Sequence, residues 1–373
     1  MIHGFAESKS FISEGHIPSG CAIGALLNRA GVRMPGTLVV DMMASMRERS
    51  TDLGAGYAGY GIYPHLKDFY AFHLMYSGAA AQVETEKLIR SKLNVEREEV
   101  IPVKRIASIK DAPLLRRYFV RPNAIAMAER RLDDEDEFVR QIVMHINSDI
   151  NGAFVFSSGK NMGVFKGVGF PEDIAEFFRL NEYEAYCWIA HGRFPTNTPG
   201  WWGGAHPFSM LNWSIVHNGE ISSYGINKRY LETFGYRCTL MTDTEVMAYM
   251  VDLLVRVHGL PAYLACKVMA PPFWAEIDRM EGEEKENYEK LRMVYGSALV
   301  NGPFGIVCGF GRGMFGLNDR IKLRPMIAAE KDDMVYIASE ESAIRSICRE
   351  PGRVWNPKGG EPVIAELYEG VAV

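Results

Sequence analysis

A turn-prone run at Pro18, Ser19 and Gly20 leads directly into Cys21 and a short apolar segment at 22–27. Pro, Ser and Gly favour turns and loops, whereas the small and apolar residues after them predict a short buried strand. Cys21 therefore lies where a loop becomes a strand, a layout that suits a nucleophile exposed at a chain start. The alternative is that Cys21 only fills space in an apolar core, as isolated cysteines commonly do.

Removal of the leader at 1–20 would give Cys21 a second functional group. Cys21 would then be the N-terminal residue, with its own α-amine close to its sulfur. An α-amine has a pKa of about 8, so it can accept a proton near neutral pH and activate a nucleophile. The leader contains Glu7, Lys9 and Glu14 and lacks the continuous apolar stretch of a signal peptide. We therefore expect a propeptide or a short tail.

The composition excludes several classes of protein. The chain has 373 residues, 47% of them hydrophobic, which predicts one large domain or two modest ones. A net charge of −5 and scattered basic residues give no electrostatic footprint for nucleic acid. The six cysteines are far apart and form no Cys-x-x-Cys pair, which argues against zinc, an iron–sulfur cluster or a disulfide framework. No segment has the length of a membrane span. The cysteine pattern suits a reducing compartment, so we expect a cytoplasmic protein, and we expect no metal site.

The first half of the chain predicts mixed helices and strands. A helix at about 38–46 and a strand at 57–63 follow the strand at 22–27. The section at about 64–180 carries no catalytic signature. Its periodicity predicts strands at 69–75 and 100–106, helices at 84–93 and 135–146, a hairpin through 154–156 and 163–165, and a helix that begins at Pro171.

Arg193 follows a predicted buried strand at 186–191 and precedes a loop that contains Pro195, Pro199 and Gly200. The planar guanidinium group can bind both oxygens of an amino-acid carboxylate, and a constrained loop reduces the entropy lost on binding. The same position also suits a structural arginine that pairs with a nearby aspartate.

A second predicted strand, at 213–217, ends at Asn218 and Gly219. Asn-Gly is the pair most able to adopt positive φ and to turn a backbone N–H outward. The Asn218 amide and the Gly219 N–H could therefore form an oxyanion hole. The alternative is a simple hairpin turn, which Asn-Gly also favours.

The run Thr242-Asp243-Thr244-Glu245 opens an amphipathic helix that closes at Gly259. Thr242 and Glu245 have the spacing of a capping box. Asp243 lies in the first turn, where it either complements the helix dipole or receives the ammonium group of a substrate.

Taken in this order, these residues resemble the class II glutamine amidotransferases, whose glutaminase domain belongs to the N-terminal nucleophile hydrolases. The runs at 192–198, 217–221 and 242–245 are similar to the amidotransferase domain of glutamate synthase. A fourth run at 317–325, followed by 335–340, resembles the strand pair that ends the same domain. The resemblance spans roughly residues 21–345.

This resemblance implies an α+β fold, a four-layer α/β/β/α sandwich with an α+β insertion at about 64–180, in a glutamine amidotransferase domain at 21–373. It also implies a role for each residue. Cys21 would attack the side-chain amide of glutamine with its own α-amine as base, and Asn218 and the Gly219 N–H would hold the oxyanion. Arg193 would bind the substrate carboxylate and Asp243 its ammonium group. A thioester would release ammonia first and glutamate after hydrolysis.

The use of the ammonia is a separate question. Little chain follows the segment at 335–340, so we expect a glutaminase subunit without a cofactor of its own, which delivers ammonia to a separate FMN-containing synthase subunit. A loop at 195–204, which includes Trp201 and Trp202, is expected to order on docking. One alternative is a glutaminase that serves another acceptor, such as N-methylglutamate synthesis. Another is a non-catalytic glutamine-binding scaffold that keeps its leader.

Overall fold

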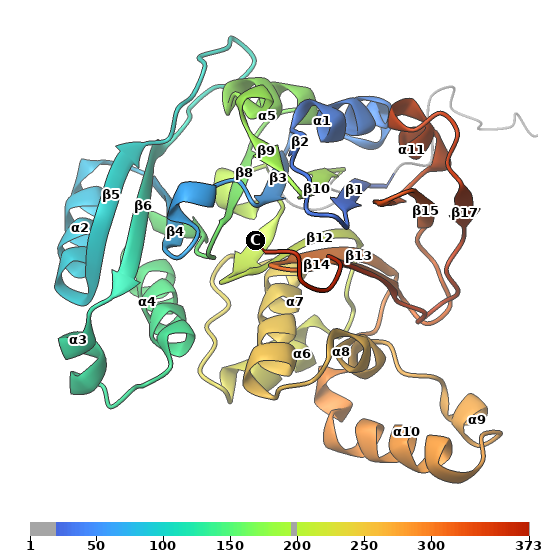
Figure 1. Cartoon of the computed structure of the whole chain (residues 1–373). Coiled ribbons are helices and arrows are strands. Elements are labelled where there is room, and N and C mark those ends of the chain that lie inside the picture. Colours follow the sequence, from blue (N-terminus) through green and yellow to red (C-terminus); the bar gives the residue numbers. More distant parts are fainter. Residues whose placement is uncertain (1–19, 195–199, 373) are drawn as a thin grey trace, which may run out of the picture.

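Two antiparallel sheets form the centre of the protein (Figure 1). The computed structural model describes residues 20–194 and 200–372. The first sheet has seven strands in the order β17-β15-β16-β1-β10-β3-β8. Its strands are β1 (Ala22–Asn28), β3 (Ala55–Tyr60), β8 (Met162–Gly167), β10 (Cys187–Gly192), β15 (Ile327–Lys331), β16 (Met334–Ala338) and β17 (Arg353–Trp355).

The second sheet has five strands in the order β11-β12-β13-β14-β18 and lies against the first (Figure 1). Its strands are β11 (Phe208–Met210), β12 (Trp213–Gly219), β13 (Phe304–Phe310), β14 (Gly313–Asn318) and β18 (Val363–Glu366). Apolar side chains from both sheets fill the space between them; they include Val216, Val307 and Met314 of the second sheet, which join the core cluster around β1 and β10.

Helices cover the outer faces of both sheets (Figure 1). The seven-stranded sheet is covered by α1 (Thr37–Ala44), α5 (Pro171–Phe177) and α11 (Glu341–Ile347). The five-stranded sheet is covered by α6 (Tyr224–Glu232), α7 (Asp243–Val251) and α8 (Ala262–Met269). The arrangement is a four-layer α/β/β/α sandwich, so the predicted α+β fold class is confirmed.

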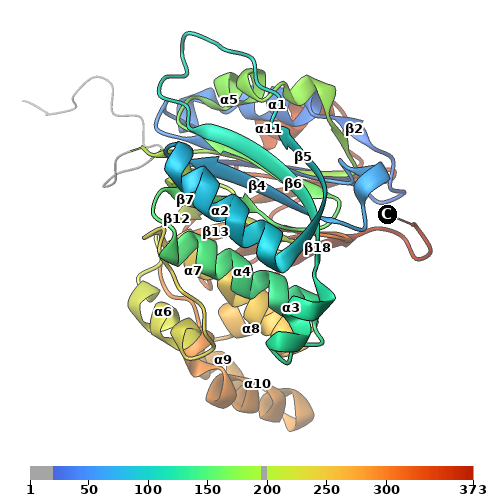
Figure 2. The ribbon, with the colours of Figure 1, turned by 90° about the vertical axis from the view of Figure 1, so that its left-hand side faces the viewer.

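A four-stranded sheet flanks the sandwich (Figure 2). Its order is β5-β6-β4-β7, and its members are β4 (Tyr70–Tyr76), β5 (Leu93–Val100), β6 (Leu114–Pro122) and β7 (Ala153–Ser157). The helices of this region are α2 (Ala79–Lys92), α3 (Ala124–Glu129) and α4 (Glu135–Asp149). The remaining elements are a small sheet of β2 (Met34–Pro35) and β9 (Glu184–Ala185), and the helices α9 (Trp274–Ile277) and α10 (Gly282–Val294), which extend away from the sandwich (Figure 1).

Two expectations for this region are wrong. The segments 154–156 and 163–165 do not form a hairpin, because β7 pairs with β4 whereas β8 pairs with β3 of the seven-stranded sheet. A short apolar run shows that a strand is buried but does not identify its partner. The strand expected at 100–106 lies instead at Leu93–Val100. This strand has charged side chains at half of its positions, so its sequence lacks a clear apolar signal, and Pro102 has no N–H for a sheet ladder.

The strand expected at 22–27 is confirmed and lies at the centre of its sheet. β1 pairs with β10 on one side and with β16 on the other, and its first six residues are buried. A Cβ atom at Gly24 would lie 3.0 Å from the sulfur of Met42 and 3.1 Å from that of Met43. The small residues of β1 therefore let helix α1 pack directly on the strand that positions Cys21.

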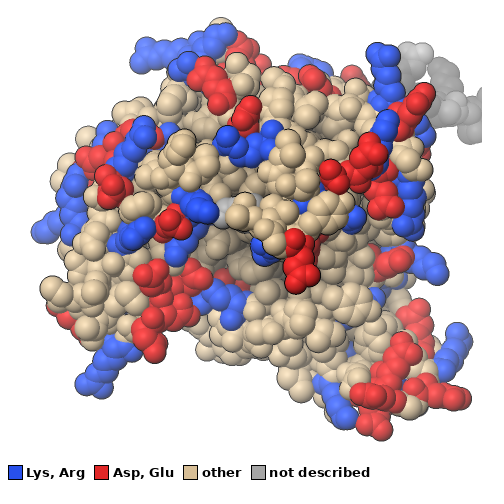
Figure 3. All heavy atoms as spheres, viewed as in Figure 1, with Lys and Arg blue, Asp and Glu red and all other residues tan. Residues whose placement is uncertain are grey.

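The face in Figure 3 carries acidic and basic side chains mixed together. This mixture of charges agrees with the net charge of −5. Within the described ranges, no helix is both long and apolar enough to cross a bilayer.

Candidate active site

The register of β1 on β10 brings Cys21 next to Arg193. Ala22 pairs with Gly192 across the antiparallel strands, so the residue before β1 faces the residue after β10. The Phe194 N–H donates to the Cys21 Sγ at 3.3 Å. Burial raises the pKa of the Cys21 thiol, while the Phe194 N–H and the nearby Arg193 and Arg324 act in the opposite direction.

Cys21 differs from the other cysteines in its exposure. All six cysteines lie in the described part of the chain, and Cys21 is the only one that is partly exposed. The other five are buried, as expected of cysteines that fill an apolar core. Cys21 therefore does more than fill an apolar core, because it lines a cavity.

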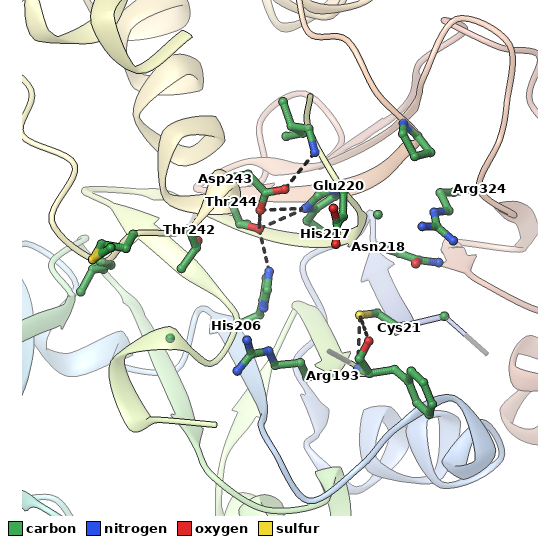
Figure 4. A pocket seen from close by; sticks show the side chains of 18 of the residues that line it. Cys21, Arg193, His206, His217, Asn218, Glu220, Thr242, Asp243, Thr244 and Arg324 are labelled. Atoms are coloured by element: carbon green, nitrogen blue, oxygen red, sulfur yellow. Dashed lines mark hydrogen bonds and ion pairs between the residues drawn. The ribbon is translucent and has the colours of Figure 1, made fainter. Parts of the chain in front are cut away.

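That cavity has a volume of about 820 Å³ (Figure 4). It lies between the start of β1, the last residues of β10 and β12, and the start of α7. All five residues singled out in the sequence line it: Cys21, Arg193, Asn218, Gly219 and Asp243. They come from four separate segments of the chain, and the pairing of the strands and the packing of α7 on β12 bring them together.

Asn218 lies at the end of β12 and is 2% exposed. Its Nδ2 is buried and has no hydrogen-bond partner among the described residues. A buried donor without a partner costs about 1–3 kcal/mol, so this amide is prepared for an acceptor that enters the cavity.

Gly219 adopts φ +140°, and a Cβ there would lie 1.9 Å from the backbone oxygen of Pro303. Only glycine fits this position. The expected positive φ is confirmed, but the hairpin alternative is wrong, because β12 pairs with β11 and β13 and the chain continues from Gly219 towards α6.

The backbone of Arg193 is fixed on both sides. Its N–H donates to the oxygen of Gly54 at 2.9 Å, and its own oxygen accepts from the Thr51 N–H at 2.9 Å. The side chain is 8% exposed, its Nη1 lies 3.5 Å from the Leu53 oxygen, and burial lowers the pKa of the guanidinium. The structure thus presents a buried cation to the cavity.

Asp243 is the first residue of α7 and carries a negative charge into the cavity. Its Oδ2 accepts from the Ile221 N–H at 2.9 Å, and its Oδ1 accepts from the Thr244 hydroxyl at 3.2 Å and lies 3.5 Å from His217 Nδ1. Burial alone would raise the pKa of this carboxyl, but His217 and the hydrogen bonds outweigh it and lower the pKa to about 2. Asp243 is therefore ionised and does more than complement the helix dipole.

The start of α7 follows the predicted capping box only in part. The Thr242 Oγ1 accepts from the Glu245 N–H at 3.2 Å, as expected of an N-cap. The Glu245 carboxylate instead accepts from the Thr239 and Leu240 N–H groups, at 3.0 and 2.9 Å. Glu245 thus holds the segment before the helix and, through it, Thr242 and Asp243. The helix continues into a π-helical turn at Asp252–Val257 and stops near Gly259, as predicted.

The structure adds cavity residues to which sequence reasoning assigned no role: His206, His217, Thr244 and Arg324. Arg324 was within a run that the resemblance identified, but no chemistry was assigned to it. Its backbone oxygen accepts from Asn318 Nδ2 at 2.6 Å, which fixes the loop after β14. His217 and Thr244 lie in the runs at 217–221 and 242–245, beside residues with predicted roles. That position in the runs was the only sequence signal for them.

Arg49, to which the sequence assigned no role, lies near the residue that precedes Cys21. Its Nη1 is 3.5 Å from the Gly20 oxygen, and its side chain forms an ion pair with Glu340. The Gly20 carbonyl therefore has a nearby cation that another side chain holds in place.

The loop expected to order at 195–204 is only partly visible, because 195–199 lie outside the described residues. Trp201 lines the cavity and packs edge-on against Phe154, with ring centroids 5.5 Å apart. Trp202 packs in the same way against Phe177, at 5.7 Å. Among the described residues, no group of three or more His, Cys, Asp or Glu side chains is placed to hold a metal ion.

Comparison with known proteins agrees with the geometry. A model of the family "Glutamine amidotransferases class-II" matches residues 79–239, a range that includes Arg193, Asn218 and Gly219. A protein of Archaeoglobus fulgidus, described as uncharacterized, is 53% identical over 93% of this chain and 92% of its own length. The glutamine amidotransferase-like protein GlxB of Rhizobium meliloti is 26% identical over 87% of this chain and 90% of its own.

A third relative is the large chain of the NADPH glutamate synthase of Bacillus subtilis, which is 27% identical over 56% of this chain and 16% of its own length. Over residues 79–239, and in the two amidotransferase relatives above, the chain is similar to the class II glutamine amidotransferases.

Proposed function

We propose that this protein hydrolyses L-glutamine to glutamate and ammonia through a thioester on Cys21. One observation carries the proposal: a single cavity holds an accessible thiol, an unpartnered amide donor, a buried guanidinium and an ionised carboxylate. These groups match the parts of a glutamine molecule: an amide to be attacked, an oxyanion to be stabilised, a carboxylate and an ammonium group.

The chemistry begins at the Cys21 sulfur. The thiolate attacks the side-chain amide carbon of glutamine, and the negative oxygen that results accepts hydrogen bonds from Asn218 Nδ2 and the Gly219 N–H. The C–N bond then breaks and ammonia leaves with the proton taken from the thiol. Water hydrolyses the remaining γ-glutamyl thioester and regenerates the thiol.

The two ends of the substrate are assigned by charge. Arg193 binds the α-carboxylate, because its planar fork can hold both oxygens. Asp243 binds the α-ammonium group, because its low pKa keeps it negative at neutral pH. This pairing selects an α-amino acid over an amide without charged ends.

A free α-amine on Cys21 completes the mechanism, so we further propose that the bond between Gly20 and Cys21 is cleaved. Burial raises the pKa of the thiol, which therefore needs a nearby base, and an α-amine with a pKa of about 8 meets that need. The position of Arg49 beside the Gly20 oxygen supports the proposal, because a cation at that distance polarises the carbonyl.

For the ammonia, we propose transfer to a separate FMN-containing synthase subunit that makes glutamate from 2-oxoglutarate. The likeness to the amidotransferase region of a glutamate synthase large chain supports this acceptor. A different acceptor is the second candidate, because GlxB, which matches over 90% of its own length, is named only as amidotransferase-like.

An assay of the purified chain with L-glutamine tests the proposal. We expect glutamate and ammonia in equal amounts from the chain alone. When a synthase partner with reduced FMN is added together with 2-oxoglutarate, glutamine consumption should increase and the ammonia should be incorporated into a second glutamate. The absence of glutamine hydrolysis from a chain that begins at Cys21 would favour the non-catalytic scaffold instead. Hydrolysis that no partner affects would contradict only the proposed acceptor.

A further inference from the structure

The Thr244 hydroxyl joins three polar side chains of the cavity (Figure 4). It lies 2.8 Å from His206 Nε2, 3.1 Å from His217 Nδ1 and 3.2 Å from Asp243 Oδ1. Thr244 itself is 0% exposed, and the three partners belong to different segments: the loop before β11, strand β12 and helix α7. A hydroxyl donates one hydrogen bond and accepts two, so these contacts use its full capacity.

Only one distribution of protons satisfies all three contacts. Asp243 is ionised, so it can accept a hydrogen bond from the Thr244 hydroxyl but cannot donate one. The single Thr244 proton therefore points to Asp243 Oδ1. His206 Nε2 and His217 Nδ1 must then each carry a proton and donate to the Thr244 oxygen.

The other ring nitrogens agree with this assignment. His206 Nδ1 and His217 Nε2 are both buried and have no hydrogen-bond partner among the described residues. With the protons placed as above, a neutral His206 leaves a bare lone pair at Nδ1. Unpaired acceptors are tolerated inside proteins more readily than unpaired N–H groups.

The surroundings keep His206 neutral. Burial, followed by His191, His217, Lys166 and Arg193, disfavours a second proton, and the pKa of His206 lies well below its ordinary value. His191 stacks on the His206 ring at a centroid distance of 4.0 Å, and its Nε2 lies 2.9 Å from the backbone oxygen of His217. His191 thus supports the ring of His206 and the backbone of His217.

We propose that Thr244 is a positioning residue for the ammonium subsite, which orients the Asp243 carboxylate, fixes the tautomer of His206 and accepts the proton on His217 Nδ1. The proposal rests on the proposed function, because glutamine is taken as the ligand. Without the hydroxyl, Asp243 loses a donor to Oδ1, and two buried ring N–H groups lose their shared acceptor. The carboxylate would then no longer be fixed towards the substrate ammonium group.

The first test compares glutamine kinetics for Thr244→Val, Thr244→Ser and the wild-type protein, each with its N-terminus determined. Valine matches the shape of threonine but removes the hydroxyl, whereas serine keeps it. Thr85→Val in α2 is the matched control, because Thr85 is also 0% exposed but donates to the backbone oxygen of Ala81 at 2.8 Å and is not on the cavity.

We expect Thr244→Val to raise the KM for glutamine about 10- to 100-fold, the range for losing one hydrogen bond to a charged group, with a smaller effect on kcat. Thr244→Ser should restore the KM, and Thr85→Val should leave it unchanged. A Thr244→Val protein with the KM of the wild type would overturn the proposal.

The second test reads the tautomers directly and is independent of activity. Nitrogen-15 NMR of histidine-labelled protein, assigned with His206→Gln and His217→Gln, should show the His206 proton on Nε2 and a His217 proton on Nδ1, with both signals altered in Thr244→Val. A His206 proton on Nδ1 would contradict the proposal. Absence of glutamine hydrolysis by the wild type would contradict the proposed function, and the NMR result would still decide the role of Thr244.

Discussion

The two walls of the cavity are built differently, although in the proposed mechanism each provides one group for the chemical step and one for the substrate. The thiol wall, at the ends of β1 and β10, carries Cys21 and Arg193 and is held by backbone hydrogen bonds and strand register. The polar wall, at the end of β12 and the start of α7, carries Asn218 and Asp243. Buried side chains hold Asp243 there through the Thr244 hydroxyl.

This difference shows how each wall should respond to substitution. On the thiol wall, a side chain can change while the backbone ladder that positions it remains, so the effects should be local. On the polar wall, the side chains around Asp243 are one another's hydrogen-bond partners. Removing one of them therefore leaves buried donors or acceptors unpaired.

The largest expected effect is on the thiol wall. Cys21→Ser should lower kcat at least about 10⁴-fold, because a hydroxyl is a far poorer nucleophile than a thiolate near neutral pH. Glutamine binding, measured by calorimetry, should be kept because Arg193 and Asp243 are unchanged. Substantial turnover by this variant would show that another group attacks the amide.

The next largest effect concerns Asn218 on the polar wall. Asn218→Ala should lower kcat about 100- to 1,000-fold, the usual result of losing one oxyanion donor, with little change in KM. Steady-state kinetics with glutamine provide the measurement, and circular dichroism serves as the control for folding. If KM rose while kcat stayed constant, Asn218 would be a substrate-binding residue instead.

Arg193→Lys tests the substrate group of the thiol wall. An ammonium group cannot reproduce the bidentate fork, so the KM for glutamine should rise about 10-fold or more and kcat should change less. Arg33→Lys is the control, since Arg33 is exposed and pairs with Glu184 on the surface. Unaltered kinetics for Arg193→Lys would identify Arg193 as a structural arginine.

The smallest effect is a pH dependence that should be nearly flat. Because the pKa of Asp243 is about 2 in the folded protein, the carboxylate stays ionised, and its contribution to stability is present above its ordinary pKa of about 3.9 and is lost as the pH falls through 2. Glutamine binding to a chain that begins with Ala at position 21 should be constant from pH 7 to about 4.5. A titration in that range that disappears in Asp243→Asn would contradict the account.

The thiol wall could be predicted from the sequence more completely than the polar wall. The apolar run after Gly20 and the buried strand before Arg193 are local patterns, and both strands form where expected. Their pairing, which places Cys21 beside Arg193, depends on register in a seven-stranded sheet, and no local pattern specifies it.

On the polar wall, motifs gave predicted roles to Asn218, Gly219 and Asp243. Thr244 lies in the run at 242–245 but received no role, and His206 lies in none of the runs. The contact between His206 and Thr244 spans 38 residues of sequence, from the loop before β11 to helix α7, and it forms only when α7 packs on the five-stranded sheet. The pairing of β7 and β8 escaped prediction for a similar reason, because each strand joins a sheet whose other members are distant in sequence.

The N-terminal residue of active protein tests the central claim most directly. N-terminal sequencing and intact mass, measured on the same preparation as glutamine turnover, should show that turnover belongs to chains that begin at Cys21. They should also show that brief incubation with glutamine leaves a γ-glutamyl group on the Cys21 peptide. Full turnover by chains that still carry Gly20 would contradict the account, since the α-amine of Cys21 would then be blocked.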